Sequence, residues 1–275
     1  MSALRLSDDA LAELAGRAVR VREAVTAFAP LLLVCEHAGN EVPPAWANLG
    51  LAAPFLETHF AWDIGAAALT ELLAEELSAA AVLATYSRLF LDLNRFPGDW
   101  DCLRPDLGGI PVPANLKSDA GDRALREAIA REPFDAVMTQ ACTRRPAVVS
   151  IHTFTPVMAG KRRQTEIGVL WREECRMGAL ALQALRDRGG FAIGSNEPYD
   201  WHGSEGYTLR RHGLDQGLPC LYLEIRNDLL MTERGRAQIA AALAPALRAE
   251  IDMLHGQMGH ENDRDQVGLP NPQGG

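Results

Sequence analysis

The sequence lacks the short motifs that mark several large enzyme classes. It contains no GxxxxGK[ST] loop and no GxGxxG after an apolar run, which are the usual phosphate-cradling signatures. It also contains neither the GxSxG turn of α/β-type serine hydrolases nor the HExxH helix of many zinc peptidases. Nucleotide-dependent and serine-hydrolase functions therefore lose their usual sequence support.

Long apolar runs and paired cysteines are also missing. No segment approaches the roughly 18 apolar residues needed to cross a membrane, and residues 1–9 contain acids rather than an apolar signal core. The five cysteines are an odd number without CxxC spacing, and Cys35 and Cys220 fall inside apolar runs. We therefore expect a cytoplasmic protein with reduced thiols and no membrane partner.

Positive charge is in deficit, since the formal net charge is −9. A nucleic-acid partner is not expected because it needs a basic footprint, although a local arginine cluster can still bind a small anion. Hydrophobic residues make up 47% and charged residues 23%, which predicts an ordinary globular core. We expect one catalytic domain over residues 1–258 and a polar, flexible tail over residues 259–275. The sequence carries no indication of oligomeric state.

Apolar runs of strand length alternate with segments of helical period. Strands are expected at residues 31–35, 81–85, 88–93, 147–152, 167–171, 191–194 and 219–225. Helices are expected within residues 8–28, from the N-cap Asp63 to 77, and over 122–143 (interrupted at Pro133), 173–188 and 232–255, with an irregular loop at 96–116. This alternation predicts a single α/β domain with a mainly parallel sheet and helices on both faces.

Three of the apolar runs end in ionisable or metal-binding side chains. They end in the stretches 34–40 (VCEHAGN), 150–153 (SIHT) and 223–227 (LEIRN). In an open α/β sheet, ligands bind at the carboxyl ends of the strands. Two histidines and a glutamate at one such edge predict a metal-assisted hydrolase.

His37 and His152 are the expected metal ligands, because each closes a buried strand and catalytic zinc sites often use two histidines. A third ligand is needed, and the residues leave Asp63, Glu36 and Glu41 open. Glu36 precedes His37 on a strand, so their side chains should point to opposite faces. Asp63 begins the next helix, where it could equally be a plain helix cap.

Glu224 lies inside an apolar strand, where a carboxylate is costly to bury unless it is paired or used. Strand alternation places Tyr222, Glu224 and Arg226 on one face. Glu224 is therefore the candidate general base for activating water. The alternative is a structural salt bridge between Glu224 and Arg226.

Two further segments offer cationic groups. Asn94 and Arg95 end a run in which Asp92 precedes them, and an Asn-Arg pair can bind a carboxylate through several donors. The alternative there is a buried Asp92–Arg95 ion pair. The glycine-flanked segment 206–213 is rich in polar donors and precedes the Glu224 strand, so it either faces the site or is a solvated loop.

Six stretches occur together and in order between residues 31 and 229. They are 35–43 (CEHAGNEVP), 61–66 (AWDIGA), 86–95 (YSRLFLDLNR), 151–156 (IHTFTP), 196–199 (NEPY) and 223–229 (LEIRNDL). In this joint pattern the sequence resembles the N-formylglutamate amidohydrolase family. The resemblance implies a fold similar to the zinc carboxypeptidases, a mixed and mostly parallel sheet between helices.

The resemblance also implies roles for single residues. It implies a metal site formed by His37, His152 and a third ligand. The zinc carboxypeptidase pattern has a Glu three residues after the first His, but this sequence has Asn40 there, and Asp63 is the expected substitute. The implied metal is Zn²⁺, with another divalent ion as the alternative. The implied base is Glu224.

The substrate side is implied in the same way. Asn94 and Arg95 would hold a substrate carboxylate, with Arg226 beside them, and Arg88 or His212 would stabilise the oxyanion. The expected reaction is hydrolysis of the amide of a small N-acyl amino acid, N-formyl-L-glutamate being the leading case. A related metal-dependent peptidase or amidase with a bulkier substrate, and a ligand-binding protein that has lost the metal, are the alternatives.

Overall fold

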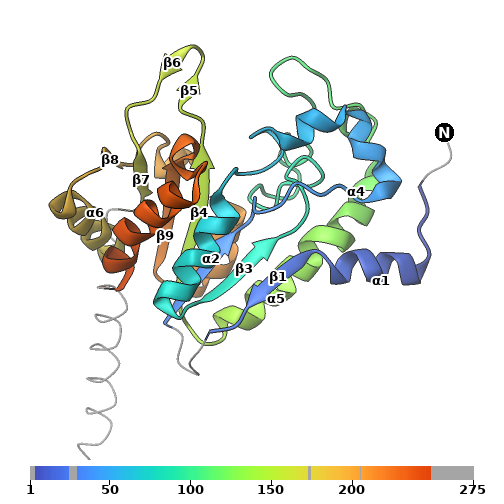
Figure 1. The fold of residues 1–275 in the computed structure, drawn as a ribbon. Coiled ribbons are helices and arrows are strands. Elements are labelled where there is room, and N and C mark those ends of the chain that lie inside the picture. Colours follow the sequence, from blue (N-terminus) through green and yellow to red (C-terminus); the bar gives the residue numbers. More distant parts are fainter. Residues whose placement is uncertain (1–3, 25–29, 173–174, 205, 249–275) are drawn as a thin grey trace, which may run out of the picture.

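A central sheet lies between two layers of helices in the computed structural model (Figure 1). The structure describes residues 4–24, 30–172, 175–204 and 206–248. The predicted single-domain α/β architecture with a mixed, mostly parallel sheet is confirmed. The predicted tail at 259–275 and its boundary at 258 lie outside the described residues. In the described part of the chain, no helix is long and apolar enough to cross a membrane.

The elements follow the chain in a largely alternating order. The strands are β1 (Val19–Arg22), β2 (Leu31–Cys35), β3 (Ala80–Ala84), β4 (Ala147–Phe154), β5 (Val157–Met158), β6 (Lys161–Arg162), β7 (Ile167–Leu170), β8 (Ile193–Ser195) and β9 (Cys220–Arg226). The helices are α1 (Asp8–Gly16), α2 (Ala66–Leu77), α3 (Pro113–Leu116), α4 (Ala120–Arg126), α5 (Glu132–Cys142), α6 (Arg176–Arg188) and α7 (Trp201–Ser204), and residues 233–248 are also helical. Shorter 3₁₀ and π segments connect them.

The main sheet has the strand order β1-β3-β2-β4-β9-β7-β8. The pairs β2–β3, β2–β4, β4–β9 and β7–β8 are parallel. The pairs β1–β3 and β7–β9 are antiparallel. The carboxyl ends of β2, β4 and β9 therefore meet at one edge in the middle of the sheet, where the sequence places its three polar stretches.

Strand alternation divides the core into two clusters, one on each face. On one face, Leu33, Val149 and Leu223 pack against α2, α6 and residues 239–247. On the other face, Val34 and Tyr222 belong to a cluster that includes side chains of α1 and α5. All positions of β2, β4 and β9 are buried, as expected for strands covered on both faces.

Two strand expectations need correction. The N-terminal region contains strand β1, which was not expected, because its VRVR sequence is short and only half-buried at the sheet edge. Residues 88–93, expected as a strand, form turns and loop. Side chains satisfy the carbonyls there instead of a neighbouring strand: Asn115 donates to Leu89 O, and Arg126 donates to Phe90 O.

The expectation that Asp63 caps a helix is also wrong. Helix α2 begins at Ala66, and its N-cap is Gly65, which has φ of 87°. A Cβ at Gly65 would lie 2.5 Å from Leu230 Cβ, so both backbone conformation and packing favour glycine there. The Asp63 side chain is thereby free for other contacts. The expected interruption near Pro133 takes the form of a π segment, Glu127–Arg131, between α4 and α5.

Candidate active site

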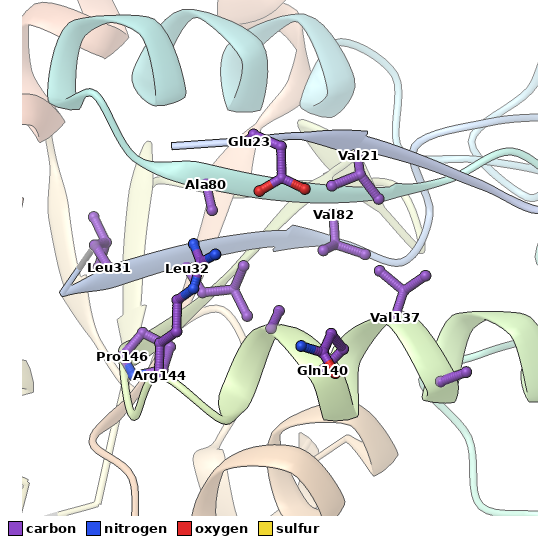
Figure 2. A pocket seen from close by; sticks show the side chains of 12 residues that line it. Val21, Glu23, Leu31, Leu32, Ala80, Val82, Val137, Gln140, Arg144 and Pro146 are labelled. Carbon is purple, nitrogen blue, oxygen red and sulfur yellow. The ribbon is translucent and has the colours of Figure 1, made fainter. Parts of the chain in front are cut away.

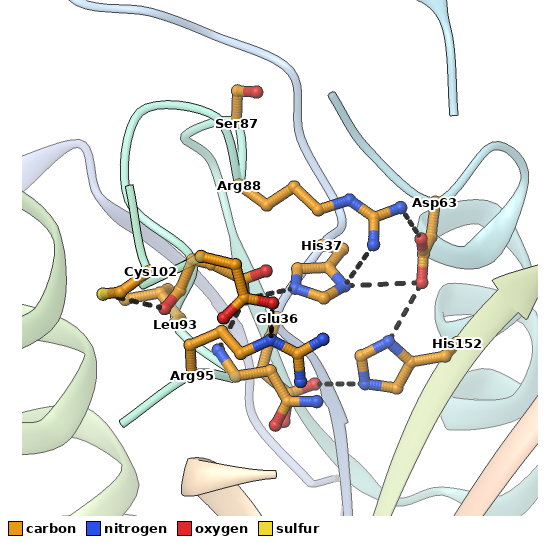
Figure 3. Close-up of polar contacts among 12 residues, drawn as sticks. Glu36, His37, Asp63, Ser87, Arg88, Leu93, Arg95, Cys102 and His152 are labelled. Atoms are coloured by element: carbon orange, nitrogen blue, oxygen red, sulfur yellow. Dashed lines mark hydrogen bonds and ion pairs between the residues drawn. The ribbon is translucent and has the colours of Figure 1, made fainter. Parts of the chain in front are cut away.

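His37, Asp63 and His152 come together at the carboxyl edge of the sheet (Figure 3). One possible ligand atom from each lies within 4.8 Å of the others, and all three residues are buried. His37 follows β2, His152 lies near the end of β4, and Asp63 is held beside β2 by a hydrogen bond from its N–H to His37 O. Two nitrogen donors and one carboxylate are a donor set that suits zinc and similar divalent ions.

Both imidazole rings turn the same nitrogen inward. His152 Nδ1 lies 3.0 Å from Asp63 Oδ2, and His37 Nδ1 lies 3.6 Å from the same oxygen. Each Nε2 points away and meets a carboxylate: His37 Nε2 lies 2.8 Å from Asp92 Oδ1, and His152 Nε2 lies 3.1 Å from Glu36 Oε2. Histidines that bind metals usually have such a carboxylate on the outer nitrogen, which fixes the tautomer and the ring orientation.

Asp63 is the carboxylate that lies with both imidazoles. Its Oδ2 accepts a hydrogen bond from Thr153 N at 3.1 Å, and its Oδ1 accepts one from Arg88 Nη2 at 2.5 Å. Burial favours the neutral acid, but Arg88 and the hydrogen bonds from His152 and His37 hold the pKa of Asp63 well below its usual range. The carboxylate form, which is the form that binds a cation, is therefore strongly favoured.

The other two carboxylates left open by the sequence lie elsewhere. Glu41 is exposed and pairs with Arg17 at 3.0 Å. Glu36 is buried but sits on the outer side of the His152 ring, where it also accepts a hydrogen bond from Ser150 Oγ at 2.8 Å. The expectation that Glu36 and His37 point to opposite faces is wrong, because β2 ends at Cys35 and the chain turns at both residues.

The charge on His152 follows from its two carboxylate neighbours. Burial favours the neutral ring, but Glu36 and Asp63 outweigh it and raise the pKa of His152 to about 10. A cation at the inner nitrogen would take the place of that proton, because imidazole binds metal only in its neutral form.

Glu224 is the register partner of His152 on the neighbouring strand β9. Its Oε2 is buried and has no hydrogen-bond partner in the described part of the structure. Burial raises the pKa of Glu224 to about 8, against the lowering effect of the His152 charge. The alternative salt bridge with Arg226 is wrong: Arg226 instead binds Glu166 Oε1 at 3.1 Å and Asp228 Oδ1 at 2.8 Å.

Arg88 reaches the cluster from the turn after β3. Besides Asp63, its Nη2 donates to His59 O at 2.6 Å, and its Nη1 lies 3.4 Å from His37 Nδ1. The guanidinium is thus next to the inner faces of both Asp63 and His37. This places a fixed positive charge directly beside the cluster.

Asn94 and Arg95 lie on the irregular loop beside this cluster. Asn94 Nδ2 donates to Tyr222 Oη at 3.0 Å, and its buried Oδ1 has no hydrogen-bond partner among the described residues. Arg95 is more exposed and pairs with Asp101 at 2.9 Å. The alternative of a buried Asp92–Arg95 ion pair is not what is found, because Asp92 instead binds His37.

His212 and Arg226 each bind carboxylates that are not part of the cluster. His212 lies in segment 209–213, and its Nε2 is 2.9 Å from Asp135 Oδ1 on α5. The segment is mostly buried rather than a solvated loop, and Gly206 packs directly against Asn94, where a Cβ would come within 1.8 Å of Oδ1. The contacts of His212 are with α5, and those of Arg226 with Glu166 and Asp228.

Three contributors to the site were not assigned from the sequence. Asp92 and Glu36 orient the two histidines, and Tyr222 stacks on the His152 ring with centroids 4.3 Å apart. Strand alternation could have placed Ser150 on the face of His152, but bringing Tyr222 to that face also needs the register between β4 and β9. Nothing comparable pointed to the Asp92–His37 contact, because it joins a turn to an irregular loop.

A groove at the opposite, amino-terminal edge of the sheet holds none of these residues (Figure 2). It has a volume of about 480 Å³ and runs between the starts of β2 and β3 and helix α5. Its lining is mainly apolar, with Leu32, Val82 and Val137 among its side chains. The ionisable side chains of the candidate site therefore lie at one edge of the sheet and this apolar groove at the other.

Fold and cluster together define an α/β protein with a candidate metal centre at the carboxyl edge of a mixed sheet. The family model of N-formylglutamate amidohydrolase matches residues 29–231. The chain therefore belongs to the N-formylglutamate amidohydrolase family, and so to a family of hydrolases.

Two solved structures illustrate this relationship. The gene product Atu2144 of Agrobacterium tumefaciens is 34% identical, with 88% of this chain and 98% of that chain covered and a TM-score of 0.81. The N-formylglutamate amidohydrolase of Ralstonia eutropha JMP134 is 19% identical, with 87% and 99% covered and a TM-score of 0.61, which shows a shared fold. No match was found among curated proteins.

Proposed function

We propose that this protein is a metal-dependent amidohydrolase that cleaves N-formyl-L-glutamate to formate and L-glutamate. The family supports amide hydrolysis of this type. The observation that carries the metal dependence is the orientation of His37 and His152, which both turn Nδ1 toward Asp63 while carboxylates hold Nε2. Such a doubly anchored set has the chemistry of a divalent metal site, with zinc as the leading ion.

A divalent cation held by these three residues would polarise an amide carbonyl and acidify water. The remaining chemistry belongs to the chain itself. Glu224 accepts a proton from the attacking water through its unpartnered Oε2 and passes it to the amide nitrogen as the C–N bond breaks.

The developing oxyanion and the substrate carboxylate need cationic partners. Arg88 supplies a charge beside Asp63 and His37, so it stabilises the negative oxygen formed when the carbonyl is attacked. Arg95 and Asn94 lie next to the same cluster and hold the α-carboxylate of the substrate. Asp101, which pairs with Arg95, keeps the guanidinium in place until substrate arrives.

The test measures formate release from N-formyl-L-glutamate by the purified, zinc-loaded protein and by Glu224→Gln. We expect a loss of about 100-fold to 10,000-fold in kcat for the variant, with zinc content unchanged. A Glu166→Gln variant is the matched control, since Glu166 is a carboxylate that binds Arg226 outside the cluster. Full activity in Glu224→Gln would rule out the proposed base.

Panels of substrates and metals separate the alternatives. Activity on N-acetyl amino acids or peptides without activity on the formyl compound would indicate a related amidase or peptidase. A protein that takes up no stoichiometric zinc, cobalt or manganese would contradict the metal site and indicate a ligand-binding role.

A further inference from the structure

Arg163 follows the β5–β6 hairpin, which stands beyond the carboxyl end of β4 (Figure 1). Its guanidinium lies over the Phe154 ring, 5.2 Å from the centroid, and over the Tyr199 ring at 5.1 Å. Phe154 is two residues after His152 on β4, on the same face of the sheet, which corresponds to roughly 7 Å along the strand. Arg163 is thus held at the same edge as the candidate metal ligands.

Residues 196–199 fix this position, and they are a stretch to which the proposed chemistry gives no role. Tyr199 Oη accepts a hydrogen bond from Arg163 Nη1 at 3.1 Å. Asn196 Oδ1 accepts one from Trp171 N at 3.0 Å, and Glu197 Oε2 one from Thr165 Oγ1 at 2.9 Å. The stretch is thereby tied to β7 and its flanks, and it presents Tyr199 to Arg163.

Arg163 differs from the other arginines near the site in its partners. Arg88, Arg95 and Arg226 each contact a carboxylate at 3.1 Å or less. Arg163 is half-buried, and its hydrogen bonds go to a carbonyl, to the Tyr199 hydroxyl and to Met158 sulfur. It has no carboxylate partner within the described ranges. A half-buried cation of this kind favours binding of an external anion.

We propose that Arg163 is a specificity-determining residue that binds the second, side-chain carboxylate of a dicarboxylic N-acyl amino acid. This inference rests on the proposed function, in which Asn94 and Arg95 hold the α-carboxylate. In a glutamyl substrate, several bonds separate the side-chain carboxylate from the amide. Arg163 directly follows the β5–β6 hairpin, which stands apart from the loop that follows Asn94 and Arg95 (Figure 1). In this proposal Arg163 receives the side-chain carboxylate while the amide lies at Glu224.

The experiment compares N-formyl-L-glutamate with N-formyl-L-glutamine, an isostere whose side chain is neutral but whose α-carboxylate is kept. Both are tested with wild type and with Arg163→Met. We expect Arg163→Met to lower kcat/KM for the glutamate compound by about 10-fold to 100-fold, mainly through KM. The glutamine compound should change by less than about 3-fold, because it lacks the charge that Arg163 binds. Arg163→Lys, which keeps the charge without the planar fork, should lie between the two.

Arg162→Met is the matched control. Arg162 is the neighbouring residue, more exposed, and its guanidinium lies 3.8 Å from Asp228. The Arg162→Met substitution removes one positive charge next to Arg163 and should leave kcat/KM for both substrates within about 3-fold of wild type. Equal losses on both substrates in Arg163→Met, or no loss on either, would overturn the assignment.

Calorimetry keeps this inference separate from the proposed function. Binding of L-glutamate and L-glutamine to zinc-loaded protein needs no turnover, and Arg163→Met should lose the preference for L-glutamate. If the wild type hydrolyses neither formyl compound, the proposed function fails, and the calorimetric preference still decides the role of Arg163. Absence of that preference in wild type, or its persistence in Arg163→Met, contradicts the inference.

Discussion

The candidate site has two halves that are built in different ways. The strand half consists of Ser150, His152, Tyr222 and Glu224, which lie on one face of β4 and β9. The loop half consists of Asp63, Arg88, Asp92, Asn94 and Arg95, which lie in turns and irregular backbone. Both halves are largely buried. The strand half contacts the His152 ring through Tyr222 and Ser150, and the loop half contacts both imidazole rings through Asp63 and the His37 ring through Asp92.

The two halves differ in what fixes their geometry. In the strand half, ladder hydrogen bonds set the register and place His152 opposite Glu224. In the loop half, buried side chains take over the role of a neighbouring strand: Arg131 donates to the carbonyls of Asp92 and Leu93. Irregular backbone can thus be buried when each carbonyl finds a side-chain donor, but it depends on a few individual residues.

The largest expected effect concerns Asp63, the residue that contacts both histidines. Asp63→Asn should lower zinc affinity by more than about 100-fold and remove activity, because it loses a direct donor rather than an outer contact. Glu41→Gln, the matched control, should change neither quantity, because Glu41 is paired at the surface. Zinc titration of both variants checks this, and equal losses would show that Asp63 is no more a ligand than Glu41.

The sequence left both Arg88 and His212 as candidate oxyanion donors. Arg88 contacts Asp63 in the cluster, whereas His212 contacts Asp135 on α5. Arg88→Gln should lower kcat by about 100-fold, as for loss of one oxyanion donor. His212→Gln should lower it by less than about 10-fold, because its imidazole is bound to Asp135 on α5. Steady-state kinetics with zinc content measured in parallel decides the matter, and the reverse order of effects would restore His212 as the donor.

A smaller effect is expected when the two outer carboxylates are changed, one beside each histidine. Glu36→Gln and Asp92→Asn should each lower zinc affinity by about 10-fold to 100-fold, the usual range for such partners of metal-binding histidines. If both fall in this range, the two histidines are held equally well. A loss confined to one variant would mean that only one ring depends on its carboxylate.

The smallest effect is on stability, and it separates regular from irregular backbone. Arg131→Met removes the side-chain donor from the buried carbonyls of Leu93 and Asp92, of which Asp92 O still accepts a hydrogen bond from Arg95 N. It should lower the free energy of unfolding by about 1–3 kcal/mol. Arg20, on edge strand β1, forms an exposed ion pair with Glu71 of α2. Arg20→Met removes this pair and should lower the free energy of unfolding by less than about 1 kcal/mol. Urea denaturation measures both, and equal values would argue against a special dependence of the loop half on Arg131.

The same contrast explains how far the sequence predicts the site. The apolar runs before His37, His152 and Glu224 locate three strands, and a parallel arrangement brings their ends together. Residue type and position in these runs are enough to suggest the chemistry. The family resemblance adds the substrate that Asn94 and Arg95 would bind, and it is consistent with the match over residues 29–231.

The rest depends on contacts that have no period in the sequence. The Asp92–His37 contact spans 55 residues and joins two irregular segments. The run at 88–93 has the composition of a strand, and only Asn115, Arg126 and other distant donors make a loop of it. Asp63 was predicted as a helix cap for similar reasons, since Gly65 takes that position through a backbone conformation that residue type alone did not reveal.

Strand β9, the last strand among the residues that the structure describes, lies in the interior of the sheet between β4 and β7. During synthesis, β7, α6 and β8 leave the ribosome before β9, yet they join the rest of the sheet only through it. Until residues 220–226 emerge, the sheet of the nascent protein is therefore in two parts, β1-β3-β2-β4 and β7-β8, and the missing residues include the proposed base. A chain shortened before this strand would contain His37, Asp63 and His152 but neither a continuous sheet nor the proposed base, so the sheet and the proposed site are completed by the same strand.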